Sequence, residues 1–84
     1  MKEIAYSRPA VRTLARMPPN LADRIRARIR AYADDPASQA RNVRRLRGSE
    51  GFLRLRVGDW RVVMRDADAL EVLHVTTRGH AYRD

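Results

Sequence analysis

Four arginines lie within one short stretch of the sequence, residues 52–65, and arginine is well suited to bind phosphate. Its guanidinium group stays charged at physiological pH and donates hydrogen bonds in a planar fork that matches two phosphate oxygens. The four are Arg54, Arg56, Arg61 and Arg65. Gathered on one surface, they would bind a phosphodiester and stabilise negative charge developing on phosphorus. The alternative is a solvated face with carboxylate partners elsewhere in the fold, because like charges opposite one another destabilise a sheet.

The spacing of this stretch predicts that a β-hairpin positions the arginines. Gly58-Asp59 suits a two-residue turn of type II′ and is flanked by runs rich in β-branched and aromatic residues. This turn sets Arg56 opposite Arg61. One face of the hairpin then carries Leu53, Leu55, Val57, Trp60, Val62 and Met64, and the other carries the four arginines with Phe52 and Val63. Because side chains alternate between faces, a slip of one residue would bury the arginines.

The composition predicts one small globular domain over residues 1–84, with a polyanionic partner. The net charge is +8, and hydrophobic residues make up 44% of the chain. We expect the partner to be nucleic acid or an acidic protein segment. The absence of cysteine fits a cytoplasmic location, and no apolar run approaches the roughly 18 residues of a membrane span. With no glycine-rich phosphate loop and no set of metal ligands, we expect no cofactor and no metal.

The first half of the chain predicts a short strand and two helices. Residues 2–7 alternate weakly, as a strand does, and Ser7 is a suitable N-cap for a helix that Pro18-Pro19 ends. The second helix begins near Asn20, has apolar residues at helical spacing, and stops at Asp34-Asp35-Pro36. The short connection predicts an antiparallel αα-hairpin. The helix arginines are interpreted as solvated, with general attraction to RNA as the alternative.

The second half predicts strands. Residues 37–41 are interpreted as a loop, 43–47 as a short strand or extended segment, and 70–77 as the last strand. The register of that strand stays open: a two-residue loop before it sets His74 opposite Arg61, and a three-residue loop sets Glu71 opposite Arg65. The expected fold is α+β, in the order β-α-α-β-β-β. Its mainly antiparallel sheet is packed on one face by the αα-hairpin, with the arginine face left open.

Two segments resemble the signature of RelE/ParE toxins. Leu46-Arg47-Gly48 is similar to a Leu-Lys-Gly segment of that family. Residues 53–64, Leu-Arg-Leu-Arg-Val-Gly-Asp-Trp-Arg-Val-Val-Met, resemble Tyr-Arg-Leu-Arg-Val-Gly-Asp-Tyr-Arg-Ile-Ile-Tyr. The helix break at residues 17–19 and the ending at residues 78–83 fit as well. The resemblance covers almost the whole chain and implies a RelE-like toxin of a type II toxin–antitoxin system.

The resemblance also implies an activity and its residues. The RelE branch cleaves mRNA in the ribosomal A site, whereas the ParE branch poisons DNA gyrase. The RelE branch is favoured, which implies a metal-independent endoribonuclease in which a ribose 2′-hydroxyl attacks the phosphodiester. The catalytic residues implied are Arg54, Arg56, Arg61, Arg78, Tyr82 and His80, and the RNA-binding candidates are Arg44, Arg45, Arg47, Arg65 and Arg83. The guanidinium group of arginine keeps its proton at physiological pH, so arginine cannot readily act as a base. The candidate proton acceptors are His80, Tyr82 and His74, in that order.

The partners implied are a cognate antitoxin, the ribosome and mRNA. Operator DNA is expected to bind only through the antitoxin complex, because the chain has no recognition-helix motif of its own, and no membrane partner is expected. Arginines stand where some RelE-type enzymes have lysines, and this keeps two alternatives open. One is a ParE-like gyrase inhibitor that is not an enzyme. The other is an inactive toxin fold that serves as antitoxin partner and corepressor.

Overall fold

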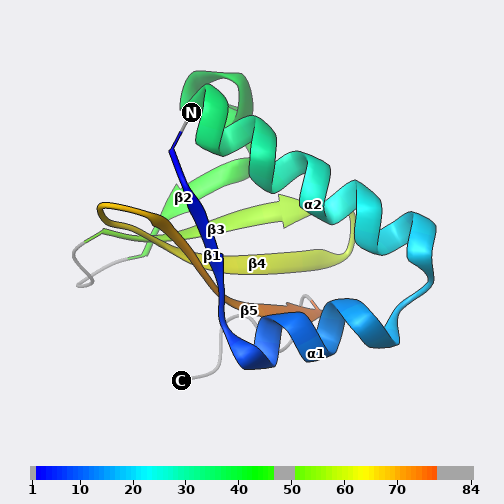
Figure 1. Ribbon diagram of the computed structural model, residues 1–84. Helices are drawn as coiled ribbons and strands as arrows, with labels where there is room; N and C mark the ends of the chain where they lie inside the picture. Colours follow the sequence, from blue (N-terminus) through cyan, green and yellow to red (C-terminus); the bar gives the residue numbers. More distant parts are fainter. Residues whose placement is uncertain (1, 47–50, 78–84) are drawn as a thin grey trace.

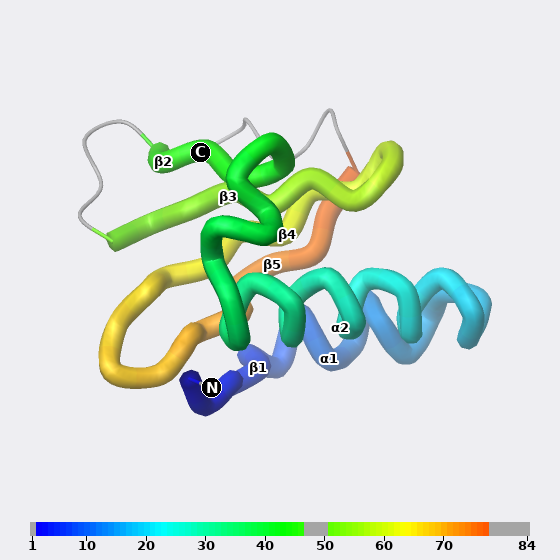
Figure 2. Tube along the Cα trace, turned by 90° about the horizontal axis from the view of Figure 1, so that it is seen from above, coloured from blue at the N-terminus to red at the C-terminus, as the bar shows by residue number. Residues whose placement is uncertain are grey.

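A five-stranded sheet with both helices on one side organises the chain (Figures 1 and 2). The computed structural model describes residues 2–46 and 51–77. The strands are β1 (Ile4–Tyr6), β2 (Val43–Arg45), β3 (Phe52–Val57), β4 (Trp60–Asp66) and β5 (Leu70–Thr77). They lie in the order β1-β5-β4-β3-β2, and only the β1–β5 pair is parallel. The predicted α+β class, with a mainly antiparallel sheet and two packed helices, is confirmed.

The segment at residues 43–47, left open between a strand and an extended segment, contains strand β2. Its residues Val43–Arg45 pair with β3. Four strands therefore follow the helices, one more than the predicted order β-α-α-β-β-β counted.

The helices begin and end where the sequence predicts. Helix α1 (Arg8–Arg16) starts at Ser7, whose Oγ accepts a hydrogen bond from the Ala10 amide at 3.1 Å. Helix α2 (Pro19–Asp34) follows directly after Pro18. Figure 1 shows that the two run in opposite directions. No helix in the described part of the chain is both long and apolar enough to span a membrane.

The loop predicted at residues 37–41 is wrong, because a 3-10 helix, η1 (Pro36–Asn42), occupies this segment. Two local features favour the tight turn. Pro36 fixes its φ near the helical value at the first position. The carbonyl of Asp35 accepts from both the amide (3.0 Å) and the hydroxyl (2.7 Å) of Ser38.

The core lies between the two helices and the covered face of the sheet. The buried side chains are Ala10, Leu14, Ala22, Ile25, Ile29, Tyr32, Ala33, Leu53, Leu55, Val57, Val62, Met64, Leu70, Val72 and Val75. All of the predicted apolar hairpin face is buried except Trp60, which is partly buried against the same core. Val11 of α1 is 50% exposed, and the buried side chains of that helix are Ala10 and Leu14.

The central hairpin has the predicted register, with Arg56 paired to Arg61 and Val57 to Trp60. Gly58 has a φ of 60°, and Asp59 has no positive φ, as a type II′ turn requires. On the other side of β4 the open question resolves in favour of the three-residue loop, since Arg65 pairs with Glu71. The register then shifts by one residue, so that Val63 pairs with His74 and the extra residue of β5 is Leu73.

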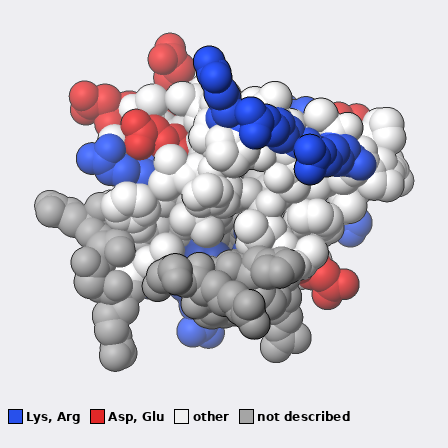
Figure 3. Space-filling view, turned by 90° about the horizontal axis from the view of Figure 1, so that it is seen from below, with Lys and Arg blue, Asp and Glu red and all other residues white. Residues whose placement is uncertain are grey.

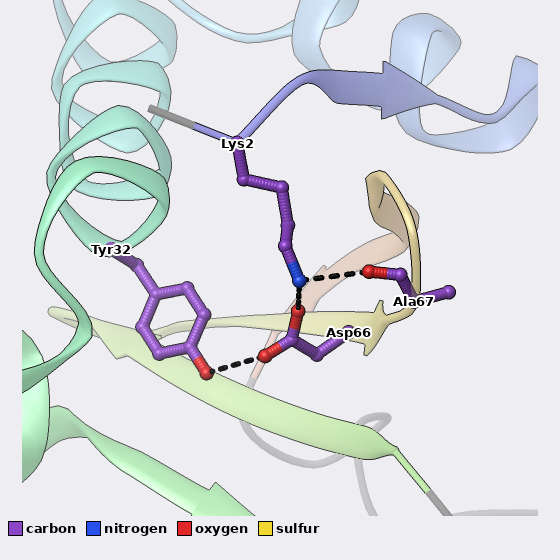
Figure 4. Close-up of polar contacts among 4 residues, drawn as sticks. All are labelled: Lys2, Tyr32, Asp66 and Ala67. Carbon is purple, nitrogen blue, oxygen red and sulfur yellow. Dashed lines mark hydrogen bonds and ion pairs between the residues drawn. The ribbon is translucent and has the colours of Figure 1, made fainter.

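A polar cluster ties three separate parts of the chain together at the β4–β5 turn (Figure 4). The Lys2 ammonium contacts the Asp66 carboxylate and donates to the Ala67 carbonyl at 2.8 Å. The Tyr32 hydroxyl of α2 lies 3.4 Å from the other Asp66 oxygen. Burial raises the pKa of Tyr32, and the negative charge of Asp66 raises it further. Asp66 therefore has a structural role that joins the N-terminal segment, α2 and the sheet.

Candidate nucleic-acid interface

The sheet face turned away from the helices, called here the open face, carries basic side chains in rows across the strands. Residues paired across neighbouring strands point to the same side, so each row can be read from the register. One row is Arg44, Arg54, Val63 and His74; the next, toward the β3–β4 turn, is Arg56, Arg61 and Thr76; and the third is Phe52, Arg65 and Glu71. The predicted arginine face is therefore formed, and the register adds a histidine to it.

Arg61 was expected to be an exposed face position, and this expectation is wrong. Its residue surface is only 7% exposed, and it is the one buried charged residue in the described part of the chain. One guanidinium nitrogen, Nη1, donates to the carbonyls of Gly58 at 3.1 Å and Trp60 at 3.0 Å. A buried charge is tolerated when its hydrogen-bonding groups are satisfied, and these two carbonyls satisfy Nη1. Arg61 therefore stabilises the β3–β4 turn through hydrogen bonds to its carbonyls.

Arg65 is already engaged within the fold. Its guanidinium lies 3.3 Å from the Glu71 carboxylate and 6.0 Å from the centre of the Phe52 ring. An opposite charge and an aromatic face hold this side chain near the β4–β5 turn. Arg65 therefore fits the alternative that the sequence left open, in which an arginine of this face has a carboxylate partner elsewhere in the fold.

The remaining candidates differ in where the structure places them. Arg44 and Arg56 are exposed on the open face, and Arg54 is half-buried there. Arg45 pairs with Leu53, so it belongs to the opposite face and does not join them. Arg47, Arg78, His80, Tyr82 and Arg83 lie outside the described residues.

His74 is exposed, and it is the only histidine among the described residues. It shares a row with Arg54 and stands two strands away, an interval of about 10 Å between backbones. An imidazole can accept and donate a proton, whereas the arginines of this face can only donate hydrogen bonds and supply charge. A phosphodiester lying between Arg54 and His74 would meet a cation on one side and a proton carrier on the other.

A hollow of about 440 Å³ opens beside the β3–β4 turn. Its lining consists of Arg28, Asn42, Arg56, Gly58, Asp59 and Arg61. Sequence reasoning missed Arg28 and Asn42 as site residues. Arg28 is one of several arginines on α2, and nothing in the local sequence marks it or Asn42 as neighbours of the hairpin.

Basic side chains also gather outside the sheet. Figure 3, seen from the side on which α1 lies, shows basic side chains in a row. Arg8, Arg12 and Arg16 are all exposed on α1 and are spaced by four residues, so they share one side of that helix. The surface is therefore basic on more than one face.

Known proteins with this fold were found by comparison of structures. The archaeal RelE–RelB complex from Pyrococcus horikoshii gives a TM-score of 0.78 at 20% identity, covering 94% of this chain and 97% of that one. The isolated Escherichia coli RelE toxin gives 0.76 at 12% identity, covering 92% and 84%. The Mycobacterium tuberculosis RelBE2 complex gives 0.62 at 25% identity, covering 92% and 98%.

Sequence comparison identifies the family. No curated protein matches the chain in sequence. The family model described as the ParE toxin of the type II toxin–antitoxin system parDE matches residues 4–82, nearly the whole chain. The fold shared with RelE toxins agrees with this match. The chain therefore belongs to the ParE toxin family, within the RelE/ParE superfamily of type II toxin–antitoxin toxins.

Proposed function

We propose that this protein is the toxin of a type II toxin–antitoxin module and that it inhibits translation by cleaving mRNA in the ribosomal A site. The observation that carries the proposal is the open face, on which Arg54, Arg56 and Arg61 lie in neighbouring rows, with His74 in the row of Arg54. The family match supports the toxin role.

The reaction that suits this face is attack of a ribose 2′-oxygen on the adjacent phosphorus. A bond forms between the 2′-oxygen and phosphorus, and the bond from phosphorus to the 5′-oxygen breaks. The products are a 2′,3′-cyclic phosphate and a 5′-hydroxyl. Negative charge builds on the phosphate oxygens during the attack, and fixed guanidinium groups stabilise it. Arg61 is held in place by two carbonyls, which accept hydrogen bonds from its Nη1.

Two protons must also move: one leaves the 2′-hydroxyl, and one reaches the departing 5′-oxygen. Among the described residues of the open face, His74 is the side chain whose ring nitrogens can both accept and donate a proton. His80 and Tyr82 are the further candidates and lie outside the described residues. The described part of the face is thus rich in fixed charge and poor in proton carriers.

This imbalance is why the proposed cleavage depends on the ribosome. An open sheet face offers little to hold a flexible strand in line for attack, and correct orientation is worth roughly 7–11 kcal/mol. The A site would supply that orientation by holding the mRNA bases. The toxin would then contribute charge and proton transfer.

The test compares one mRNA in two states. Purified protein is incubated with the naked mRNA and with the same mRNA in programmed ribosomes that have an empty A site, and the new 5′ ends are mapped. We expect cuts at codon positions in the ribosome sample and far slower cutting of naked RNA. Equal rates in the two samples would contradict ribosome dependence, and no cutting in either would contradict the endonuclease proposal.

The matched family model favours a second candidate, inhibition of DNA gyrase, because the model is that of ParE toxins. Inducing the protein without an antitoxin separates the two candidates. Translation arrest with cuts at codon positions supports the nuclease, whereas SOS induction and filamentation support gyrase inhibition. A strain that grows normally would contradict both and indicate an inactive toxin fold.

A cognate antitoxin is the partner proposed for this chain. Two of the similar folds, from Escherichia coli, were solved as RelBE and DinJ–YafQ toxin–antitoxin complexes. The net charge of +8 favours an antitoxin segment that carries acidic residues beside an amphipathic helix. Operator DNA would bind through the antitoxin part of the complex.

A further inference from the structure

The hollow beside the β3–β4 turn exists because the edge strand β2 is short. Strand β2 pairs with β3 only from Leu53 to Leu55, and before Val43 the chain is η1. Figure 2 shows this segment rising from the end of α2 to the edge of the sheet. No described strand flanks the last two residues of β3 on that side. The space is lined from the helix side by Arg28 and from the end of η1 by Asn42.

The charge in the hollow is positive and largely uncompensated. Within the described residues, neither Arg28 nor Arg56 makes a hydrogen bond or an ion pair. Arg61 uses only its Nη1 atom within the described structure, which leaves Nε and Nη2 as further donors. Asp59 contributes one carboxylate, but it forms no ion pair with the three arginines. Three guanidinium groups around one small space repel one another, and an anion between them would relieve that repulsion.

We infer that this hollow is a second phosphate subsite, which binds one phosphodiester of the same RNA strand that crosses the open face. The inference rests on the proposed function and names Arg28 and Asn42 as positioning residues. Arg56 and Arg61 belong both to the hollow and to the open-face row, so a strand that contacts them on the face is continuous with the hollow. The RNA strand thus passes around the edge of the sheet at the β3–β4 turn and reaches α2.

The size and lining of the hollow favour an RNA phosphate over an acidic protein segment. A space of about 440 Å³ holds a small group such as a phosphate with part of its nucleotide. A helix, about 10 Å across with its side chains, does not enter a space of this size. The lining offers guanidinium forks and the amide of Asn42, all of which hydrogen-bond to phosphate oxygens, and contains no large apolar side chain.

The experiment measures binding of a short RNA that carries 2′-O-methyl groups and is therefore not cut, over a range of salt concentrations. Arg28→Ala should weaken binding about tenfold and reduce the slope of log K against log salt by about 0.7, the value for one lost phosphate contact on a single strand. Arg24→Ala is the matched control, because Arg24 is an arginine one turn earlier on α2 that does not line the hollow. It should weaken binding less than twofold.

Asn42→Asp is the second variant. It places a carboxylate in the hollow at almost unchanged size, so it should weaken RNA binding at least as much as Arg28→Ala. The melting temperature of each variant shows whether the fold is retained. A single methylphosphonate, moved along the RNA, distinguishes a strand phosphate from a free ion. At one position in the RNA, the methylphosphonate should weaken binding to the wild-type protein about tenfold but should not weaken binding to Arg28→Ala any further. This is the non-additive result that a double-mutant cycle gives for two groups that contact each other.

Several results would overturn the inference. Equal losses for Arg28→Ala and Arg24→Ala would show general attraction by net charge. A loss of binding to inorganic phosphate alone, with RNA binding unchanged, would show a free-anion site. An Arg28→Ala protein that binds RNA normally but releases an antitoxin would assign the hollow to a protein partner. If wild-type protein binds the RNA and Arg28→Ala binds it equally well, only this inference fails; if wild-type protein neither binds nor cuts RNA, even on ribosomes, the proposed function fails with it.

Discussion

The guanidinium of Arg61 donates to the carbonyl of Gly58 at 3.1 Å, across the two-residue turn that joins β3 to β4. The same nitrogen also donates to the carbonyl of Trp60 at 3.0 Å. One side chain thus closes the turn and lines the hollow beside it. Arg61 therefore has both a structural role in the turn and a proposed role in binding phosphate.

We predict that Arg61→Ala lowers both stability and activity. The substitution removes two hydrogen bonds from a charged, buried group, which should cost about 1–3 kcal/mol, or roughly 4–8 °C in melting temperature for each kcal/mol lost. Arg56→Ala is the matched control, since Arg56 is the exposed partner of Arg61 in the register. It should reduce cutting on ribosomes but change stability by no more than about 0.5 kcal/mol. Thermal unfolding checks both variants, and an Arg61→Ala protein that melts like the wild type would contradict the structural role.

We predict that Leu55→Ala destabilises the protein by about 2–5 kcal/mol, because Leu55 is fully buried and its loss leaves a cavity in the core. Urea unfolding measures the change. Val63→Ala, on the open face of the same hairpin and only half-buried, should cost markedly less. Similar losses for the two variants would contradict the placement of the core on the helix side of the sheet.

We predict that stability falls in the alkaline range because of two tyrosines. Burial raises the pKa of Tyr6, and burial together with Asp66 raises the pKa of Tyr32, both above the usual value of 10.0. Between the unfolded and folded pKa values the native state keeps protons that the unfolded state releases, so stability is fully present below about pH 10 and declines as pH rises through the folded pKa values.

The measurement is urea unfolding from about pH 8 to pH 11, for the wild type and for a Tyr6→Phe/Tyr32→Phe variant. The variant should show a shallower decline. The two proteins differ only at these two positions, so the difference between them isolates the tyrosines. An equal decline in the two proteins would contradict the prediction.

We predict that His74→Ala slows ribosome-dependent cutting by about 10²–10⁴-fold if His74 is the proton carrier. The melting temperature should change little, because His74 is exposed. Single-turnover cutting on programmed ribosomes gives the rate. An unchanged rate would assign proton transfer to His80 or Tyr82, and His80→Ala or Tyr82→Phe would then be the variant that loses activity.

We predict that the antitoxin complex depends on charge. A +8 chain bound by an acidic segment should associate more slowly as salt rises, while the apolar part of the contact holds the complex together once formed. Association and dissociation rates measured over a series of salt concentrations provide the check. An association rate independent of salt, or a structure of the complex in which only uncharged surfaces meet, would be incompatible with this partner.

The sequence by itself determined the hairpin and the helix boundaries, because these depend on residues close together in the chain. Gly58 supplies the positive φ of the turn, and the alternation of apolar and basic residues leaves one register that keeps the arginines out of the core. Ser7 and the adjacent prolines Pro18-Pro19 mark where the first helix begins and ends.

The tertiary structure decided what depends on distant parts of the chain meeting. The extra residue of β5, Leu73, lies where its carbonyl accepts a hydrogen bond from the Ser7 hydroxyl at 2.5 Å, and the resulting shift puts His74 in the row of Arg54. The hollow depends on where β2 ends relative to α2. Local sequence patterns carry no record of these contacts, because each forms between groups that only the folded sheet and helices bring within hydrogen-bonding or packing distance.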